Sequence, residues 1–218
     1  DLLTNPRDGP DGWKYVHAGM LMLANCSELM TDDAEQHVAL ATQVVALLRD
    51  HAALRERADA LGVLANMCEF KGPLFQLHTH TLIVPAIATA MRDPWSRVRQ
   101  YSTLAVMGYT QSLSGAIDAE ALEPYLLDLF SPMFDILGAD APPARASALS
   151  ALSALIEAAG ELAVPYYDNI MPALKAILAA DDVAVDPALV AGARAAGRRG
   201  AMLAAIAAAR HAREMKGL

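Results

Sequence analysis

The stretch LIVPAIATAMRD at residues 82–93 decides the fold, because its pattern returns twice further along the chain. In each copy, a proline inside an apolar segment of helical periodicity is followed eight or nine residues later by an aspartate. The other copies are FSPMFDILGAD (130–140) and IMPALKAILAADD (170–182). An interior proline removes a backbone hydrogen bond and bends a helix, so one that recurs once per unit predicts a regularly bent outer helix. The predicted bends are at Pro85, Pro132 and Pro172.

A second type of helix alternates with these segments. Each begins near a basic anchor residue, which is followed by small residues and leucines at helical spacing, as suits a helix packed between two neighbours. The anchors are 40, 42 and 46 residues apart: His17, Arg57, Arg99 and Arg145. We call these the inner helices. A period of about 40 to 47 residues with two helices per unit is typical of HEAT and armadillo solenoids.

The recurring aspartate precedes the next inner helix in each unit. There it is expected to accept hydrogen bonds from free N–H groups at the helix start, or to pair with the arginine of an adjacent unit. The alternative is an ordinary solvated loop residue. The three residues concerned are Asp93, Asp140 and Asp181.

The predicted fold is all-α, an α-solenoid of HEAT repeats whose antiparallel helix pairs build a right-handed superhelix. The last helix is rich in alanine, which buries little area, so the end of the array is expected to pack loosely. Since the chain opens on half a repeat and shows no polar cap, it is expected to be a piece of a longer solenoid. We expect a linker or the end of a preceding repeat at 1–11, a single inner helix at 12–30, and repeats at 34–70, 73–113, 119–161 and 164–212.

Composition narrows the function. The 218 residues are 55% hydrophobic with a net charge of -8, which argues against a surface for nucleic acid or anionic lipid and favours a basic partner. No uninterrupted apolar stretch approaches the roughly 20 residues of a membrane span, and residues 1–12 do not resemble a signal peptide, so an intracellular protein is expected. Cys26 and Cys68 lack metal-type spacing and are expected to be small buried residues.

Motifs for catalysis or cofactor binding are absent from the sequence, so we expect neither an enzyme nor a cofactor. His78 and His80 are two residues apart on a predicted helix and point in different directions, so no metal site is expected. The basic sequence GRRG at 197–200 lies at the start of an inner helix, like Arg57 and Arg99, and is interpreted as a structural cation of the repeat.

Four polar side chains recur late in the inner helices, eleven or twelve residues after the anchors. Such helices pack about 8 to 10 Å apart, so these side chains predict a ladder along which an extended lysine-rich segment binds. The alternative is four solvated helix-end residues. We call Glu28, Glu69, Gln111 and Glu157 the acceptor row.

Asn66 and Tyr109 stand within a turn of this row and are expected to hydrogen-bond an extended backbone, although Tyr109 equally suits the core. Trp13 and Trp95 lie at inner-helix starts, where packing against the preceding unit is the expected role and a cage around a lysine stem is the alternative.

Three segments resemble a known family. WKYVHAG at 13–19, RVRQYSTLAVMG at 97–108 and VPYYDNIMPALKAIL at 164–178 are similar, in order and spacing, to segments of the importin-beta superfamily, and most similar to the importin-five branch. The resemblance covers roughly residues 12 to 180. Two features depart from the pattern: Ser112, where the branch often has an acidic residue, and the alanine-rich sequence after residue 183.

The resemblance implies a central part of a nuclear import receptor that shuttles between cytoplasm and nucleus. It implies basic cargo of the ribosomal-protein or histone type on the concave inner face, and contacts with Ran-GTP and nucleoporins through the full-length receptor. A HEAT-repeat scaffold subunit of a stable assembly is the competing hypothesis. Salt-sensitive binding of lysine-rich peptides favours the receptor, whereas a large apolar interface favours the scaffold.

Overall fold

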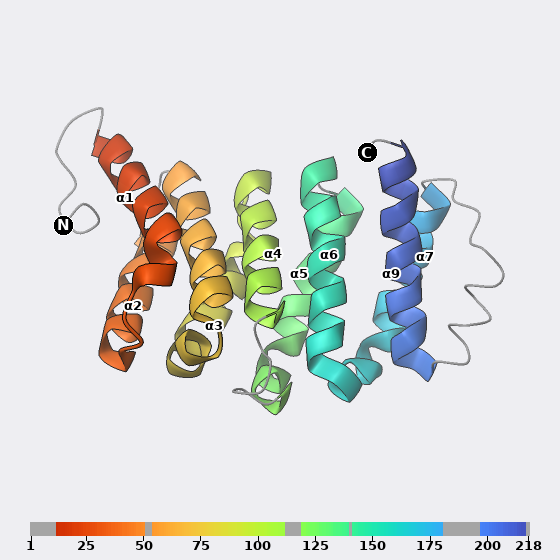
Figure 1. The fold of residues 1–218 in the computed structure, drawn as a ribbon. Coiled ribbons are helices and arrows are strands. Elements are labelled where there is room, and N and C mark those ends of the chain that lie inside the picture. Colours follow the sequence, from red (N-terminus) through yellow and green to blue (C-terminus); the bar gives the residue numbers. More distant parts are fainter. Residues whose placement is uncertain (1–11, 51–53, 112–118, 140, 181–196, 217–218) are drawn as a thin grey trace. The chain divides into compact units, whose positions relative to one another are not determined.

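The computed structural model describes residues 12–50, 54–111, 119–139, 141–180 and 197–216 (Figure 1). All secondary structure in these ranges is helical. The chain divides into two compact units, Asp1–Asp118 and Ala119–Leu218, and each is described by itself.

The described residues of the first unit form four α-helices and one 3₁₀ turn. The helices are α1 (Gly12–Cys26), α2 (Ala34–Asp50), α3 (Leu54–Ala90) and α4 (Ser96–Gln111), and the turn η1 is Ser27–Leu29. Helix α3 contacts α1, α2 and α4. It consists of two helices, 54–71 and 73–90, joined at Gly72, whose φ of 46° is accessible mainly to glycine. The second helix turns back beside the first.

Buried side chains at helical spacing hold this unit together. Leu61, Leu64 and Met67 in the first part of α3 are 1% exposed or less, and so are Phe75, Ile83 and Ile87 in the second part. Because each set lies on faces covered by neighbouring helices, burial of apolar surface stabilises the packed array rather than any single helix.

The second unit contains α5 (Leu126–Ala139), α6 (Pro142–Ala159), α7 (Tyr167–Ala180) and α9 (Gly197–Lys216). The 3₁₀ turns η2 (Ala119–Tyr125) and η3 (Gly160–Tyr166) lead into α5 and α7. Pro165 therefore lies in the turn before α7, two residues before the helix begins. Gly160, with a φ of 57°, ends α6.

The recurring prolines all lie inside helices. Pro85 belongs to α3, Pro132 to α5 and Pro172 to α7, and each helix continues past its proline. Among the described helices, α3 alone has non-helical backbone angles in its interior, at Gly72. The sequence was therefore correct in reading these prolines as interior rather than terminal, while the size of the bend stays a prediction.

The end of the second unit packs through a narrow apolar face. Met202, Ile206 and Ala209 of α9 are fully buried, and they lie at the three- and four-residue spacing of one helix face. Only Met202 and Ile206 among them are large, as the alanine-rich sequence predicts.

One helical stretch among the described residues, Pro142–Ala176, meets the length and composition of a membrane span. Of its most apolar window, 56% is buried inside the protein, and buried core helices satisfy the same criterion. The positive φ of Gly160 also interrupts the stretch, so it is weak support for a span.

Candidate functional site

Three inner helices of the first unit, α1, the first part of α3 and α4, run in the same direction, and their C-terminal halves lie side by side. The Asn66 side-chain amide of α3 donates to the Ala24 carbonyl oxygen of α1, with a nitrogen-to-oxygen distance of 3.2 Å. Helices α3 and α4 touch through their backbones, since a Cβ atom added at Gly108 would lie 2.8 Å from the Ala65 carbonyl oxygen. These two contacts set the level at which α1, α3 and α4 lie beside one another.

The acceptor row lies about one turn beyond these contacts. Glu28 follows Ala24 by four residues, Glu69 follows Asn66 by three, and Gln111 follows Gly108 by three. All three side chains are exposed. Glu28 lies in η1 and Gln111 is the last residue of α4, so the row marks the ends of the inner helices. Three exposed acceptor side chains thus stand at one level of the first unit.

The fourth residue of the row belongs to the second unit. Glu157 is exposed near the end of α6, where its carboxylate accepts a hydrogen bond from the Ser153 hydroxyl at 3.3 Å. It occupies the same position within its helix as Glu69 does in the first part of α3.

The two residues predicted to assist the row have other surroundings. Asn66 is partly buried, and its side-chain amide donates a hydrogen bond to the Ala24 carbonyl oxygen. Tyr109 is 2% exposed, so the expectation that its side chain contacts a ligand is wrong, and the core alternative is correct. Its helix position turns the ring inward, and its carbonyl oxygen accepts a 2.5 Å hydrogen bond from the Gln76 side chain.

An arginine and an aspartate of neighbouring repeats join at the other end of the inner helices. Arg57 approaches Asp93 through two nitrogens, at 2.9 and 3.3 Å, and both side chains are 12% exposed. Asp93 also accepts from the Trp95 amide at 2.9 Å, and its carbonyl accepts from Arg99 at 2.6 Å. Both roles predicted for this aspartate are therefore confirmed, whereas Asp140 and Asp181 lie outside the described residues.

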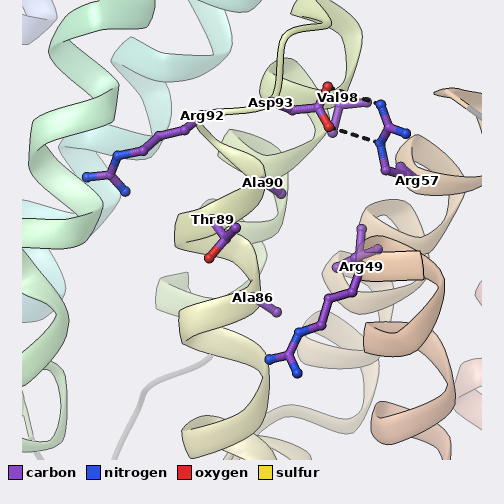
Figure 2. Close-up of a pocket in the computed structure, with 9 residues that line it drawn as sticks. Arg49, Arg57, Ala86, Thr89, Ala90, Arg92, Asp93 and Val98 are labelled. Carbon is purple, nitrogen blue, oxygen red and sulfur yellow. Dashed lines mark hydrogen bonds and ion pairs between the residues drawn. The ribbon is translucent and has the colours of Figure 1, made fainter. Parts of the chain in front are cut away.

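This pair borders a pocket of about 420 Å³ between α2 and the second part of α3. Figure 2 shows Arg57 directed at Asp93 and Arg49 extended toward Ala86, while Arg92 points away from both. Sequence reasoning missed the pocket, because Arg49 belongs to α2 and Arg92 to the turn after α3, and no local spacing connects them. The arginines favour an anionic group, but they do not converge on one point.

The starts of α1 and α3 are joined by charge. The guanidinium of Arg55 stacks over the Trp13 ring at 4.5 Å, and Lys14 lies 5.9 Å from the same ring. One turn further along, His17 Nδ1 lies 2.5 Å from an Asp59 carboxylate oxygen. The Trp13 face is therefore already covered by the protein's own cations. Trp95, by contrast, is 54% exposed.

His78 forms a pair with a histidine that sequence reasoning overlooked. His78 Nδ1 and His37 Nδ1 are 3.4 Å apart, and His37 Nε2 lies 3.1 Å from the Thr31 carbonyl oxygen. Because the Thr31 oxygen needs a donor, His37 carries its hydrogen on Nε2 and accepts from His78 on Nδ1. Burial is the main cause that lowers the pKa of His37, and the nearby His78 lowers it further.

The remaining question is whether the described residues could bind a metal ion or include a reactive cysteine. Among residues whose positions are described, no group of three or more His, Cys, Asp or Glu side chains is arranged to hold a metal ion. Cys68 is buried, which raises the pKa of its thiol. Cys26 is exposed, contrary to expectation, because it is the final residue of α1.

The interpretation of GRRG needs a correction. Arg199 donates to the Glu157 carbonyl oxygen at 3.3 Å, and Arg198 lies over the Tyr167 ring at 5.4 Å. The start of α9 therefore lies beside the end of α6 and the start of α7, so α9 runs antiparallel to α6 (Figure 1). Arg199 does not occupy the place that Arg57 and Arg99 occupy in their helices.

Comparison with known proteins gives a consistent relationship. No family model matches the sequence. Importin subunit beta-3 of Saccharomyces cerevisiae is 25% identical over 167 residues, which cover 76% of this chain and 15% of that protein. The chain thus spans about a seventh of this relative.

Solved structures share the fold. The crystal structure of Kap121p has a TM-score of 0.74 and 20% identity, covering 99% of this chain and 20% of that one. Kap121p bound to Pho4p gives 0.74 with 21% identity over the same shares. The described helices are those of karyopherin HEAT repeats, which confirms the predicted fold class. In fold and in sequence, the chain is therefore similar to importin-beta karyopherins.

Proposed function

We propose that the chain forms part of the cargo-binding surface of a nuclear transport receptor, and that its acceptor row binds lysine-rich segments of cargo proteins. One observation carries the proposal: Glu28, Glu69 and Gln111 are exposed at one level on three adjacent parallel helices. An extended peptide that crosses these helices meets an acceptor side chain at each one.

Charge supports the same partner. The chain has a net charge of -8, which favours encounter with basic segments. Lys71 follows Glu69 closely, but its ammonium lies 3.4 Å from an Asp32 carboxylate oxygen, so this cation is paired locally. Glu28 and Glu69 remain available to accept from lysine.

The family relationship supplies the setting. Karyopherins are transport receptors and not enzymes. Kap121p has been crystallised with Pho4p, with Ste12p and with Nup53p, which shows that a protein of this fold binds several partners. We infer from this that the present chain serves a receptor that moves between cytoplasm and nucleus, with basic cargo on the inner face. Contacts with Ran-GTP and nucleoporins belong to the full-length receptor.

A scaffold role is the second candidate, and exposed apolar side chains favour it. Leu29 is 83% exposed, Met22 61% and Phe70 50%. A stable interface would cover such residues and depend little on salt. Peptide binding through the acceptor row would instead weaken as salt rises.

The test replaces Glu28 and Glu69 by lysine in the full chain. We expect a labelled lysine-rich peptide to bind more weakly by about 1 to 3 kcal/mol at low salt, because two charge-assisted contacts become repulsive. The matched control replaces Glu120 and Glu123, which are exposed on η2, and should leave binding nearly unchanged. Fluorescence anisotropy at low and physiological salt measures both. Equal losses from the two pairs would show that only net charge matters.

A further inference from the structure

The start of α9 brings two cations to the end of α6. Arg199 donates to the Glu157 carbonyl oxygen at 3.3 Å, and Arg198 stacks on the Tyr167 ring at 5.4 Å. The α9 helix is then fixed by Met202 and Ile206, which are fully buried. The chain therefore places Arg199 at the Glu157 backbone and Arg198 on the ring of Tyr167.

The attraction at this point is of the kind proposed for cargo. The last carbonyl groups of a helix lack intrahelical partners and carry partial negative charge, and the Glu157 carboxylate lies in the last turn of α6, two residues before its end. A lysine or arginine of a cargo segment would seek the same carbonyls and carboxylate. Arg199 already donates to one of these carbonyls, that of Glu157.

The contact is built weakly enough to be displaced. Among the described residues, its one hydrogen bond, to the Glu157 carbonyl oxygen, is long and exposed. A guanidinium held at a structural site would be expected to use several of its five donors, as Arg57 does with Asp93.

We propose that Arg198 and Arg199 act as an internal pseudo-cargo, which occupies the acceptor end of α6 until a basic segment of a partner protein displaces it. This inference rests on the proposed function of the acceptor row. It adds regulation to that function, since the affinity for cargo is reduced by the fraction of molecules in which the arginines are docked.

The experiment compares two single variants of the full chain that remove the same charge from the same helix. Arg199→Ala removes the docked cation, and Arg210→Ala removes an exposed cation further along α9. A fluorescein-labelled lysine-rich peptide is the probe. We expect Arg199→Ala to bind it about threefold to tenfold more tightly, Arg210→Ala to match the wild type, and Arg199→Lys to restore the wild-type affinity.

Hydrogen exchange gives a second readout. If the peptide displaces the arginines, amides in the first turn of α9 should exchange faster when peptide is added, while buried amides around Leu152 in α6 should not. A merely structural cation would give no such release.

The outcomes separate the two proposals. Equal tightening in Arg199→Ala and Arg210→Ala would overturn the pseudo-cargo and leave a bulk charge effect. Binding that depends on Glu69 but is unchanged or weaker in Arg199→Ala would also overturn it, and would leave the acceptor row standing. Failure of every variant to bind the peptide would overturn both.

Discussion

Gly108 lies at a close approach between the backbones of α3 and α4. We predict that Gly108→Ala lowers the free energy of unfolding of the first unit by about 1 to 3 kcal/mol, because the new Cβ would lie 2.8 Å from the Ala65 carbonyl oxygen and would push the helices apart. Gly138→Ala in α5 is the control, since no atom lies within 4 Å of its added Cβ. Urea unfolding measures both. A neutral Gly108→Ala would mean that the helices separate at no cost.

Single residues also show what periodicity predicts well. Asp93 was assigned its partners correctly, because the aspartate and the arginine recur at fixed positions in each repeat and a buried charge needs a partner. Tyr109 was harder, since near the end of a helix a step of one residue turns a side chain by about 100° and moves it from core to solvent. The burial of Tyr109 was therefore undecided until its neighbours were known.

Helices α2 and α3 meet around His37, and this contact depends on pH. Burial and the neighbours His78 and Lys71 lower the pKa of His37, while the Thr31 hydrogen bond and Asp32 oppose them. The unfolded chain therefore binds this proton more readily than the folded protein does. Stability is complete above the ordinary pKa of 6.5 and falls as the pH drops through 6.5 toward the lowered value.

We predict that urea unfolding of the wild type shows lower stability at about pH 5.5 than at about pH 7.5, by at most about 1.4 kcal/mol, since pH 5.5 lies one unit below the ordinary pKa of 6.5. His37→Gln keeps a donor for the Thr31 carbonyl oxygen and removes the titration, so its stability should vary less with pH. An identical pH dependence in the variant would assign the effect to other histidines.

The direction of α9 relative to α6 could not be predicted from the sequence. Its buried residues Met202, Ile206 and Ala209 give one apolar face, and such a face packs equally well with the helix running either way. The sequence predicts the relative direction of the inner helices in the first unit more clearly, since each has a basic anchor at its start and an acceptor residue at its end. In α9 the arginines lie at the start of the helix, as expected, but Arg199 contacts the end of α6 and not its start.

At the scale of the whole chain, the sequence divides into two compact units between residues 118 and 119. Both tryptophans of the sequence, Trp13 and Trp95, lie in the first unit. Tryptophan fluorescence therefore reports on the first unit alone, whereas circular dichroism reports helix loss in both. Repeat arrays lose cooperativity when an interface is weak.

We predict that the fluorescence and circular dichroism transitions in urea do not coincide. Gly108→Ala should move the fluorescence midpoint and only part of the dichroism curve, because its effect is confined to the first unit. Leu152→Ala, which opens a cavity in α6, should move the dichroism curve and leave the fluorescence midpoint in place. Superimposable curves in all three proteins would show a single cooperative domain.

The backbone contact at Gly108 and the hydrogen bond from the Asn66 amide to the Ala24 carbonyl oxygen have a consequence for how this repeat array changes in evolution. The side chains one turn beyond them are exposed and contribute little to packing, so substitution there should change the free energy of unfolding only slightly. The contacts themselves tolerate no inserted residue without moving every position that follows. The residue type at the exposed positions can therefore change, for example from glutamate to glutamine or serine, while the spacing between these positions stays the same.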